Sequence, residues 1–464
     1  MSPTMQSIVN FLITWWVELV CGVVIVAVVP LVAGYVVLVE RKLMADMQAR
    51  LGPMRVGPHG LLQPIADAVK LLIKEDIIPD NADTLIFWLA PVISMTAALT
   101  SMGAIYFGPS FGVARDINVG ILFVLGVSSL GLLGIVLGGW ASNSHYSIIG
   151  AMRSTAQLVS YETAGGLAIV SGLLLSGTLS IRAIVNAQNQ SQVWFVFLAP
   201  VAFFIYLVAS IAETNRAPFD LPEAESELVA GYMTEYSGFR WALYFLGEYA
   251  NMIVVASVAT TLFLGGWLRP FPNVHWLRWL DFCPGLFLAL IGVYSIYRAG
   301  KQPVAIQVWF MWAVALGCFA VAVIFGFPLF VHQMHTWGLL ASLPSFDFVI
   351  PGLNGAFWFL LKVAAYIYVF MWLRFTLPRY RFDQLMHIGW YILIPLAIVN
   401  VLAVGVAMLL QYEAGWNRWL ALIVTTIFTL ATAAYLVRLH DRRTENASTA
   451  VAVAEGRTTD SYAG

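Results

Sequence analysis

The chain has 464 residues, of which 60% are apolar and only 11% are charged, and its mean hydropathy is +0.81. A soluble domain normally carries about 25% charged residues, so this composition excludes an ordinary soluble globular protein. The formal net charge of −1 offers no basic surface to nucleic acid, and no nucleic-acid partner is expected.

Apolar stretches of about 18 residues or more recur along the chain, as they do in membrane-spanning α-helices. We therefore predict an all-α fold, a polytopic membrane helix bundle with about 11 transmembrane helices. They are expected near residues 15–39, 84–107, 119–141, 156–177, 194–212, 241–265, 283–297, 304–331, 355–375, 387–410 and 418–437. The first stretch is long and lacks Lys and Arg before it, which argues against a cleaved signal peptide.

The distribution of Lys and Arg predicts the sidedness of the chain. With the N-terminus outside, the inner segments hold 18 of the 24 Lys and Arg residues, the outer segments hold 5, and Lys362 lies within a span. This bias follows the positive-inside rule and places the C-terminus in the cytoplasm. Segment 283–297 is short for a hydrocarbon core of about 30 Å. It is retained because omitting it would move Arg374, Arg379 and Arg381 to the outer side.

Residues 40–83 form an inner loop that is too polar to span the membrane. Helical spacing between Gly60 and Glu75 predicts an amphipathic surface helix with one narrow polar stripe, made of Gln63, Asp67, Lys70 and Lys74. This helix either packs on the bilayer surface or lines a cavity that opens there. The irregular cationic segment before it, rich in Gly and Pro, contains Arg41, Arg50 and Arg55 and is suited to a polar or anionic head group.

A second inner loop, residues 213–240, is acidic. It holds two arginines, Arg216 and Arg240, and six acidic residues: Glu213, Asp220, Glu223, Glu225, Glu227 and Glu235. The spacing of Asp220 and Glu223 predicts a capping box that opens a short helix, on which Glu223 and Glu227 would repel each other. If that helix is solvated, the segment is a polar loop. If it is buried, one carboxyl group should keep its proton near neutral pH.

Two further carboxylates fall within predicted spans. Glu162 and Glu248 are expected about 10 Å from the inner surface, counted from helices that begin near residues 156 and 241. An ionised group in a span costs a few kcal/mol and therefore faces a partner or water. These carboxylates form either structural ion pairs or, with the acidic loop, a route for protons or cations. Lys362 either continues this route or extends to the outer interface.

The cysteines and the sequence motifs give no sign of a resident cofactor. Cys21, Cys283 and Cys318 lie far apart, and no C-x-x-C or Cys/His group occurs, so neither a metal nor an iron–sulfur cluster is expected. The sequence also lacks a glycine-rich nucleotide-binding motif. Any electrons that take part in redox chemistry would come from other chains.

Two long segments resemble the signatures of one family. Residues 60–75 read GLLQPIADAVKLLIKE, and residues 218–231 read PFDLPEAESELVAG. They are similar to the H-type subunit of the proton-pumping NADH:quinone oxidoreductase, complex I of the respiratory chain, which is subunit 1 in mitochondria. Shorter runs with the same likeness are Glu40–Lys42, Ser160–Glu162, Ala212–Arg216 and Leu377–Asp383. The resemblance covers roughly residues 15–268 and 355–410.

The resemblance implies eight core spans, so the pair at 283–331 is interpreted as an inserted hairpin and the helix at 418–437 as a C-terminal addition. The expected organisation is 1–268, N-terminal core helices with quinone-chamber loops; 269–354, the hairpin; 355–412, the last two core helices; and 413–464, the extra helix and a disordered tail. An inserted pair preserves the orientation of the helices that follow it. This agrees with the Lys and Arg bias.

The resemblance also implies the function. The chain would form much of the quinone chamber and the start of the proton route, and would couple quinone reduction to proton translocation. The residues implied to bind quinone are Arg41, Asp67, Lys70, Arg216 and Asp220. The residues implied to form the proton route are Glu162, Glu213, Glu223, Glu225, Glu227 and Glu248.

As a subunit of this translocase, the chain would bind no nicotinamide, flavin or iron–sulfur group, and quinone would be its substrate. Its implied partners are the peripheral redox arm, neighbouring membrane subunits and lipid, in the bacterial inner membrane. Two alternatives belong to other classes. A membrane subunit of an energy-converting hydrogenase would bind no quinone, which the intact first signature disfavours. A proton-coupled secondary transporter would often show an internal repeat, which the sequence lacks.

Overall fold

The computed structural model describes residues 3–109, 112, 116–220, 229–271, 275–301, 305–336, 349–415 and 417–454. In this part of the chain the regular structure is helical, and the only β-type pairing is an isolated bridge between Tyr106 and Gly112. The predicted all-α class is therefore confirmed.

The helices follow one another with short connections. The first group is α1 (Pro3–Met47), η1 (Pro58–Gly60), α2 (Gln63–Ile73), α3 (Thr84–Gly103), α4 (Gly120–Ala141), α5 (His145–Ser176), α6 (Ile181–Ser191), α7 (Phe195–Leu198) and α8 (Pro200–Glu213). The second group is η2 (Gly231–Met233), α10 (Gly238–Leu262), η3 (His275–Phe282), α11 (Cys283–Ala299), α12 (Ala305–Thr336), α13 (Val349–Thr376), α14 (Phe382–His387), the π-helical η4 (Ile388–Leu393), α15 (Ile394–Glu413) and α16 (Arg418–Ala454).

Nine helices in the described residues are long and apolar enough to cross a membrane, and Pro200–Glu213 and Trp419–Tyr435 are shorter apolar helices. Each of the eleven predicted spans lies on one of these helices, although the exact number that cross the membrane stays a prediction. The short segment near 283–297 belongs to a 20-residue apolar helix, Leu280–Ala299, which is long enough to span. The chain is thus a multi-pass membrane protein.

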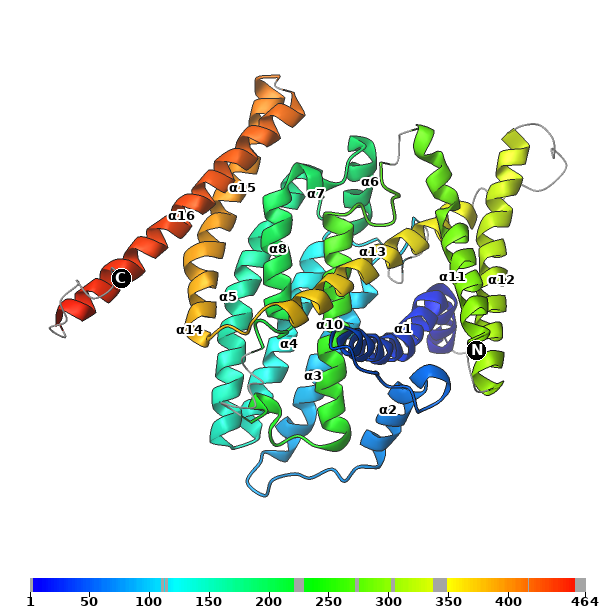
Figure 1. Ribbon diagram of the computed structural model, residues 1–464, viewed down its shortest axis with the longest axis horizontal. Helices are drawn as coiled ribbons and strands as arrows, with labels where there is room; N and C mark the ends of the chain where they lie inside the picture. The colour runs from blue at the N-terminus through cyan, green and yellow to red at the C-terminus, as the bar shows by residue number, and fades with distance from the viewer. Residues whose placement is uncertain are drawn as a thin grey trace.

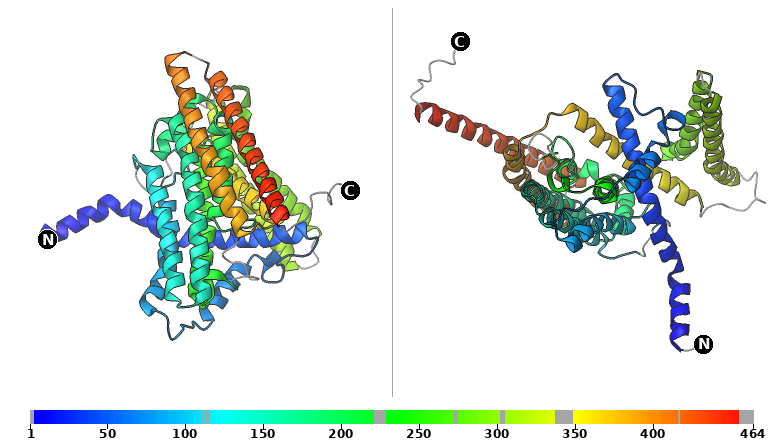
Figure 2. Two further views of the ribbon diagram at one scale, coloured as in Figure 1. Left: turned by 90° about the vertical axis from the view of Figure 1, so that its left-hand side faces the viewer. Right: turned by 90° about the horizontal axis from the view of Figure 1, so that it is seen from below.

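The helices α3, α4, α5, α8 and α10 stand side by side in the centre of the molecule (Figure 1). The pair α15–α16 flanks one side of this bundle, and the hairpin α11–α12 flanks the other. The helices α1 and α13 run across the direction of the others, and α1 projects beyond the bundle at its N-terminal end (Figure 2). Because α1 crosses both α2 and α10, its C-terminal half lies where the inner loops meet the bundle.

One predicted span is broken by a proline. The expected helix 194–212 consists of α7 and α8, and Ala199 between them has φ −135° and ψ 63°, outside the helical region. Pro200 disfavours a helical conformation in the residue before it, which accounts for the break. As predicted, Glu213 is the last residue of the helix.

The buried apolar residues form two clusters. The larger one joins α5, α8, α10, α13 and α15 through the middle of the bundle. The smaller one has four buried rings at its centre, which belong to Phe87, Tyr232, Tyr236 and Tyr244. The two clusters contain different residues of the same helices, so the smaller cluster is a separate unit of packing at the acidic loop.

The hairpin α11–α12 packs mainly on itself. It contacts α13 and η1, but only 6% of the membrane-length part of α12 is buried within the chain. Its outward residues are large and apolar, among them Leu286, Trp309 and Leu316. Such a surface suits lipid or a neighbouring membrane protein.

The C-terminal helix is longer than predicted. The sequence indicates a helix near 418–437 and disorder after about residue 444, whereas α16 continues to Ala454. The segment 444–454 is rich in alanine, which has the highest helix propensity, and this explains the continuation. Residues 455–464 lie outside the described residues.

Lys362 neither extends to the outer interface nor contacts the buried carboxylates. Its side chain is buried, and its ammonium group donates hydrogen bonds to the carbonyl oxygens of Leu264 at 2.7 Å, Gly266 at 2.9 Å and Leu268 at 2.5 Å. The ammonium also lies 4.3 Å from the centre of the Trp194 ring. These carbonyls belong to the turn that follows α10, so Lys362 fixes α13 to that turn. Both sequence interpretations of Lys362 are therefore wrong.

We expect Lys362→Met to lower the free energy of unfolding by about 2 kcal/mol or more, because three buried carbonyls lose their donor. Thermal unfolding of the detergent-purified protein measures this effect. Lys301→Met is the matched control, since Lys301 is exposed and bonds the Tyr297 hydroxyl. Equal shifts in the two variants would show that the carbonyl contacts add nothing.

Candidate functional site

A cavity of about 200 Å³ lies between α1, α2 and α10. Its wall is mainly apolar, with Val37 from α1, Leu71 from α2 and Phe245 from α10. An apolar cavity of about 150 Å³ is sufficient to hold benzene. This cavity therefore has room for one substituted six-membered ring.

The polar part of the cavity wall comes from Arg41, Asp67 and Lys70. The Asp67 carboxylate accepts a hydrogen bond from Arg41 at 2.9 Å and another from Gln63 at 3.0 Å. No residue of α2 is buried, so these polar contacts and the helix ends fix α2 against the bundle. The structure thus places Asp67 and Lys70 of the predicted stripe on a cavity wall.

The loop before α2 is held by Lys42, whose ammonium donates to the His59 carbonyl oxygen at 2.5 Å. The loop requires Gly60, which has φ +75°, because a Cβ there would lie 2.1 Å from the Pro53 carbonyl oxygen. Burial lowers the pKa of His59, and the positive charges of Lys42 and Arg298 lower it further. Arg298 belongs to α11, so the hairpin adds positive charge beside this loop.

A second, smaller cavity brings together Glu162 from α5, Glu213 from α8 and Glu248 from α10. Its volume is about 40 Å³, and an adjacent cavity of about 20 Å³ shares Glu162, Glu213 and Asn251. A water molecule needs roughly 10–15 Å³ in a polar site, so both cavities can hold water. The Ser129 hydroxyl donates to Glu162 at 2.6 Å. We call this pair of spaces the acidic cavity.

The position of Glu162 along its helix differs from the prediction. The helix α5 begins at His145 rather than near 156, so Glu162 lies near its middle and not in its second turn. The additional residues, 145–155, are polar enough to lie outside lipid yet continue the helix. Glu248 similarly lies near the middle of α10. The boundaries of membrane helices cannot be read from apolar windows where the helix extends beyond the hydrocarbon.

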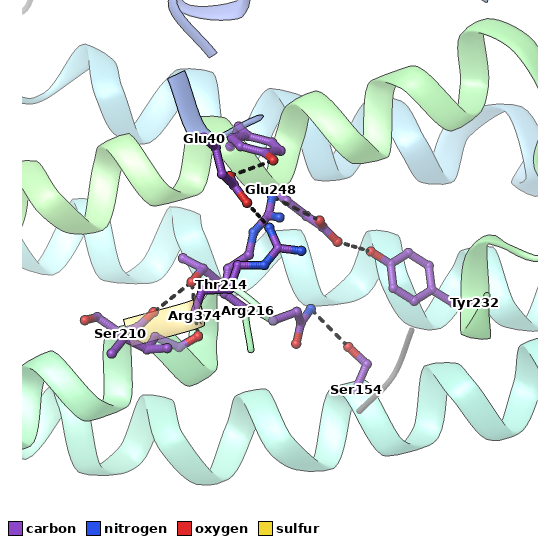
Figure 3. Close-up of polar contacts among 11 residues, drawn as sticks. Glu40, Ser154, Ser210, Thr214, Arg216, Tyr232, Glu248 and Arg374 are labelled. Atoms are coloured by element: carbon purple, nitrogen blue, oxygen red, sulfur yellow. Dashed lines mark hydrogen bonds and ion pairs between the residues drawn. The ribbon is translucent and has the colours of Figure 1, made fainter. Parts of the chain in front are cut away.

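Glu248 connects the acidic cavity to a buried arginine (Figure 3). One carboxylate oxygen accepts a hydrogen bond from the Tyr232 hydroxyl at 3.0 Å, and the other lies 3.8 Å from the Arg216 guanidinium. Arg216 is 6% exposed, and its guanidinium stacks on the Tyr249 ring at 4.0 Å. The charge of Arg216 is therefore balanced by a carboxylate and by a ring face.

The same network continues to α1 and α13. The Tyr249 hydroxyl donates to Glu40 at 2.9 Å, and Arg374 of α13 pairs with the other oxygen of Glu40 (Figure 3). Glu40 is 3% exposed, although it is next to Arg41, which lines the larger cavity. A continuous set of polar contacts thus runs from the wall of the larger cavity to the acidic cavity.

The segment after α8 is held by the loop between α13 and α14. The Asp220 carbonyl oxygen accepts a hydrogen bond from Arg379, and the Tyr380 amide donates to the Pro218 carbonyl oxygen at 3.2 Å. The predicted capping box and Glu223, Glu225 and Glu227 lie in residues 221–228, outside the described residues. The structure therefore brings together Glu162, Glu213, Arg216 and Glu248, with Asp220 at the end of the same segment.

Four members of the network are absent from the predicted site: Glu40, Tyr232, Tyr249 and Arg374. Glu40 is part of a run that carries the resemblance, so its position at the end of an apolar span was an available signal. Arg374 is counted only as a positive charge on the inner side. The tyrosines lie among many aromatic residues, and their spacing alone does not distinguish them from packing residues.

In the part of the chain that the structure describes, no group of three or more His, Cys, Asp or Glu side chains is arranged to hold a metal ion. The cysteines Cys21, Cys283 and Cys318 are free thiols. The polar groups that the site does offer are carboxylates, arginines and tyrosine hydroxyls.

We expect Arg374→Gln to destabilise the protein by about 3–5 kcal/mol, because Glu40 stays buried without its cation. The double variant Glu40→Gln/Arg374→Gln should recover most of this loss, which identifies the unpaired charge as the cause. Denaturant or thermal unfolding measures both. The control is Arg50→Gln at an exposed position of the loop after α1, and an equal loss there would contradict the expectation.

A bundle of membrane-length helices with paired charges in its interior and a cavity at one end defines a multi-pass membrane protein that handles charge or a polar ligand. A model of the NADH dehydrogenase family matches residues 19–405. The chain belongs to this family, which contains the H-type subunits of NADH-quinone oxidoreductases and is the subunit 1 family of complex I.

Its relatives include the second H-type NADH-quinone oxidoreductase subunit of Solibacter usitatus, which is 51% identical over 387 residues and aligns with 82% of this chain and 93% of its own length. The first H-type subunit of Koribacter versatilis is 49% identical, with 81% of this chain and 87% of the relative aligned. The first H-type subunit of Geobacter sulfurreducens is 39% identical, with 86% and 97% aligned. The predicted family is confirmed.

Proposed function

We propose that this chain is the membrane subunit of a proton-translocating NADH:quinone oxidoreductase that receives quinone and begins the proton route. The observation that carries the proposal is the polar network between the two cavities. It begins at Arg41 and Glu40, neighbours on α1, and ends at Glu248 in the acidic cavity. Such a network allows a change of charge in one cavity to alter the electrostatic potential in the other.

The larger cavity suits a quinone head group. Its apolar wall excludes water from the ring, whereas Arg41, Asp67 and Lys70 supply charged hydrogen-bonding groups at one side. A quinone that accepts two electrons must also gain two protons to become the quinol. The electrons come from redox groups of other subunits, and this chain's residues orient the ring and compensate its charge.

Proton movement is assigned to the carboxylates. Negative charge that develops on the quinone lies in a medium of low dielectric constant, so it acts strongly on the arginines of the network. A displacement or change in field at Arg216 changes the balance of charge at Glu248, which lies 3.8 Å away. Glu248, Glu162 and Glu213 face one water-sized space, so a proton added to one of them changes the field at the others. Glu223, Glu225 and Glu227 are proposed to extend this route.

The assembly and location follow from the same proposal. The names of the bacterial relatives describe a subunit of an NADH-quinone oxidoreductase, which supports partner subunits for this chain too. We assign the chain to the bacterial inner membrane with its N-terminus outside and its C-terminus in the cytoplasm. The exposed apolar faces of the helices contact lipid or neighbouring membrane subunits.

The family relationship disfavours the two alternative functions. Purification of the chain with its native neighbours separates them. A large assembly with NADH:quinone activity supports the proposal, whereas a chain that moves a solute in liposomes on its own contradicts it. A hydrogenase component would copurify with hydrogen-evolving activity and would show no quinone dependence.

We expect Asp67→Asn to raise the quinone KM about tenfold with little change in kcat, because the charge-assisted contact to Arg41 is lost from the cavity wall. Steady-state kinetics of the purified complex measure both constants. The control is Asp80→Asn, an exposed residue after α2 that lines neither cavity. The same KM change in both variants would exclude a specific role for Asp67.

We expect Glu213→Gln and Glu248→Gln to reduce coupled quinone reduction by about a factor of ten or more without disassembling the complex, because a proton carrier is lost. Glu227→Gln carries the same expectation from sequence. NADH oxidation coupled to proton uptake or release in proteoliposomes measures the effect, and native gel electrophoresis checks assembly. The control is Glu413→Gln at the exposed end of α15. Full coupled activity in all the variants would exclude this acidic route.

A further inference from the structure

The C-terminal end of α2 is fastened to the start of α10 by an ion pair. One Asp76 carboxylate oxygen accepts a hydrogen bond from Nε of Arg240 at 2.8 Å and lies 2.6 Å from Nη2 of the same guanidinium, and Arg240 is 1% exposed. The adjacent Ser237 hydroxyl accepts from the Ile77 amide at 2.9 Å and donates to the Glu75 carbonyl oxygen at 3.3 Å. The position of α2 is therefore fixed relative to Arg240.

From Arg240 a continuous stack of buried rings leads into the bundle. The guanidinium lies 4.9 Å from the Phe87 ring, which stacks on Tyr236 with centroids 4.1 Å apart and planes 6° apart. Tyr236 meets Tyr244 edge to face at 5.0 Å, and Tyr244 meets Tyr232 in the same way at 5.2 Å. We call Arg240 and these four rings the ring stack. Its last member, Tyr232, donates to Glu248.

The rings have little room to move independently. The Tyr244 hydroxyl donates to the Gly134 carbonyl oxygen at 2.9 Å, and the Tyr236 hydroxyl donates to that of Gly138 at 3.4 Å. A Cβ at Gly138 would lie 2.2 Å from the Tyr244 hydroxyl oxygen, so glycine is required for this approach. Burial raises the pKa of Tyr236 to about 12, and its hydroxyl keeps its proton at neutral pH. Close packing of this kind transmits a displacement.

Glu248 is suited to respond to such a displacement. Its two oxygens have different partners, the Tyr232 hydroxyl and the Arg216 guanidinium. A shift of Tyr232 turns the carboxylate and changes its separation from Arg216, which is already 3.8 Å and longer than a direct hydrogen bond. Small movements therefore produce a large change in how well Arg216 is compensated.

We propose that the ring stack couples the position of α2 to the orientation of Glu248, with Tyr232 as the positioning residue. Occupation of the larger cavity displaces α2, the Asp76–Arg240 pair carries the displacement to the stack, and Tyr232 resets the Glu248–Arg216 contact. This inference rests on the proposed function, because it takes the larger cavity as the quinone site. It provides a mechanical link beside the electrostatic one through Glu40 and Tyr249.

The test uses the assembled complex in proteoliposomes and measures protons pumped per NADH oxidised. Phe87→Leu interrupts the stack at a residue that lines neither cavity, and Tyr232→Phe removes only the hydroxyl at its end. Each should lower the ratio about twofold or more, the lower end of what residues in a coupling network contribute. The double variant should be no worse than the single variants, since both interrupt one link. The matched control is Phe359→Leu, a buried ring of α13 outside the stack.

A spectroscopic readout separates coupling from packing. The infrared bands of the Glu248 carboxyl group, assigned by comparison with Glu248→Gln, should change when a quinone-site inhibitor binds. Phe87→Leu and Asp76→Asn should abolish that change, whereas Phe359→Leu should keep it. If Phe87→Leu prevents assembly, Tyr236→Phe replaces it, because it keeps the ring and removes the hydroxyl.

Three results would overturn the inference: an unchanged pumping ratio in Phe87→Leu, additive losses in the double variant, or an inhibitor-induced band change that persists in Asp76→Asn. None of them affects the proposed function, which fails instead if Asp67→Asn and Glu248→Gln leave quinone kinetics and coupling intact.

Discussion

The pairing of Glu40 with Arg374 holds together parts of the chain that are 334 residues apart. A carboxylate that is 3% exposed within a membrane bundle is tolerated only with a cation and further hydrogen bonds, and Arg374 and Tyr249 supply both. This requirement fixes α1 against α10 and α13. The crossing of α1 over the bundle, and the larger cavity beneath it, follow from that attachment (Figure 2).

Charge has different roles in different parts of the molecule. Beside the acidic cavity, carboxylates and arginines face water-sized spaces and one another, so their interactions can be rearranged. At the turn after α10, the ammonium of Lys362 is enclosed by three carbonyls and the face of Trp194. All three of its hydrogen bonds are made to the main chain, so this charge is structural. Burial alone therefore does not identify a functional charge, whereas the nature of the partner does.

Most of the helical framework could be predicted from sequence, because lipid restricts each span to a long apolar run. The family could be recognised because Gly60–Glu75 and Pro218–Gly231 are polar segments with unusual composition. Tertiary pairings were beyond this reasoning. Nothing local to Glu40 indicates Arg374 as its partner, and the apolar window around Glu162 conceals that α5 begins at His145. Lys362 was misassigned because main-chain acceptors in a turn leave no trace in side-chain patterns.

Glu40 and Arg41 are consecutive, yet one points into the buried network and the other lines the larger cavity. Successive residues of an α-helix differ in direction by about 100°, so the two side chains share one azimuthal setting of α1. Insertion or deletion of a single residue in α1 on the N-terminal side of Glu40 would rotate one part of this 45-residue helix against the other by that angle. Either the apolar face of α1 or both functional side chains would then be misdirected. The reading frame of α1 is for this reason fixed from both sides, and length variation is confined to the segments outside it.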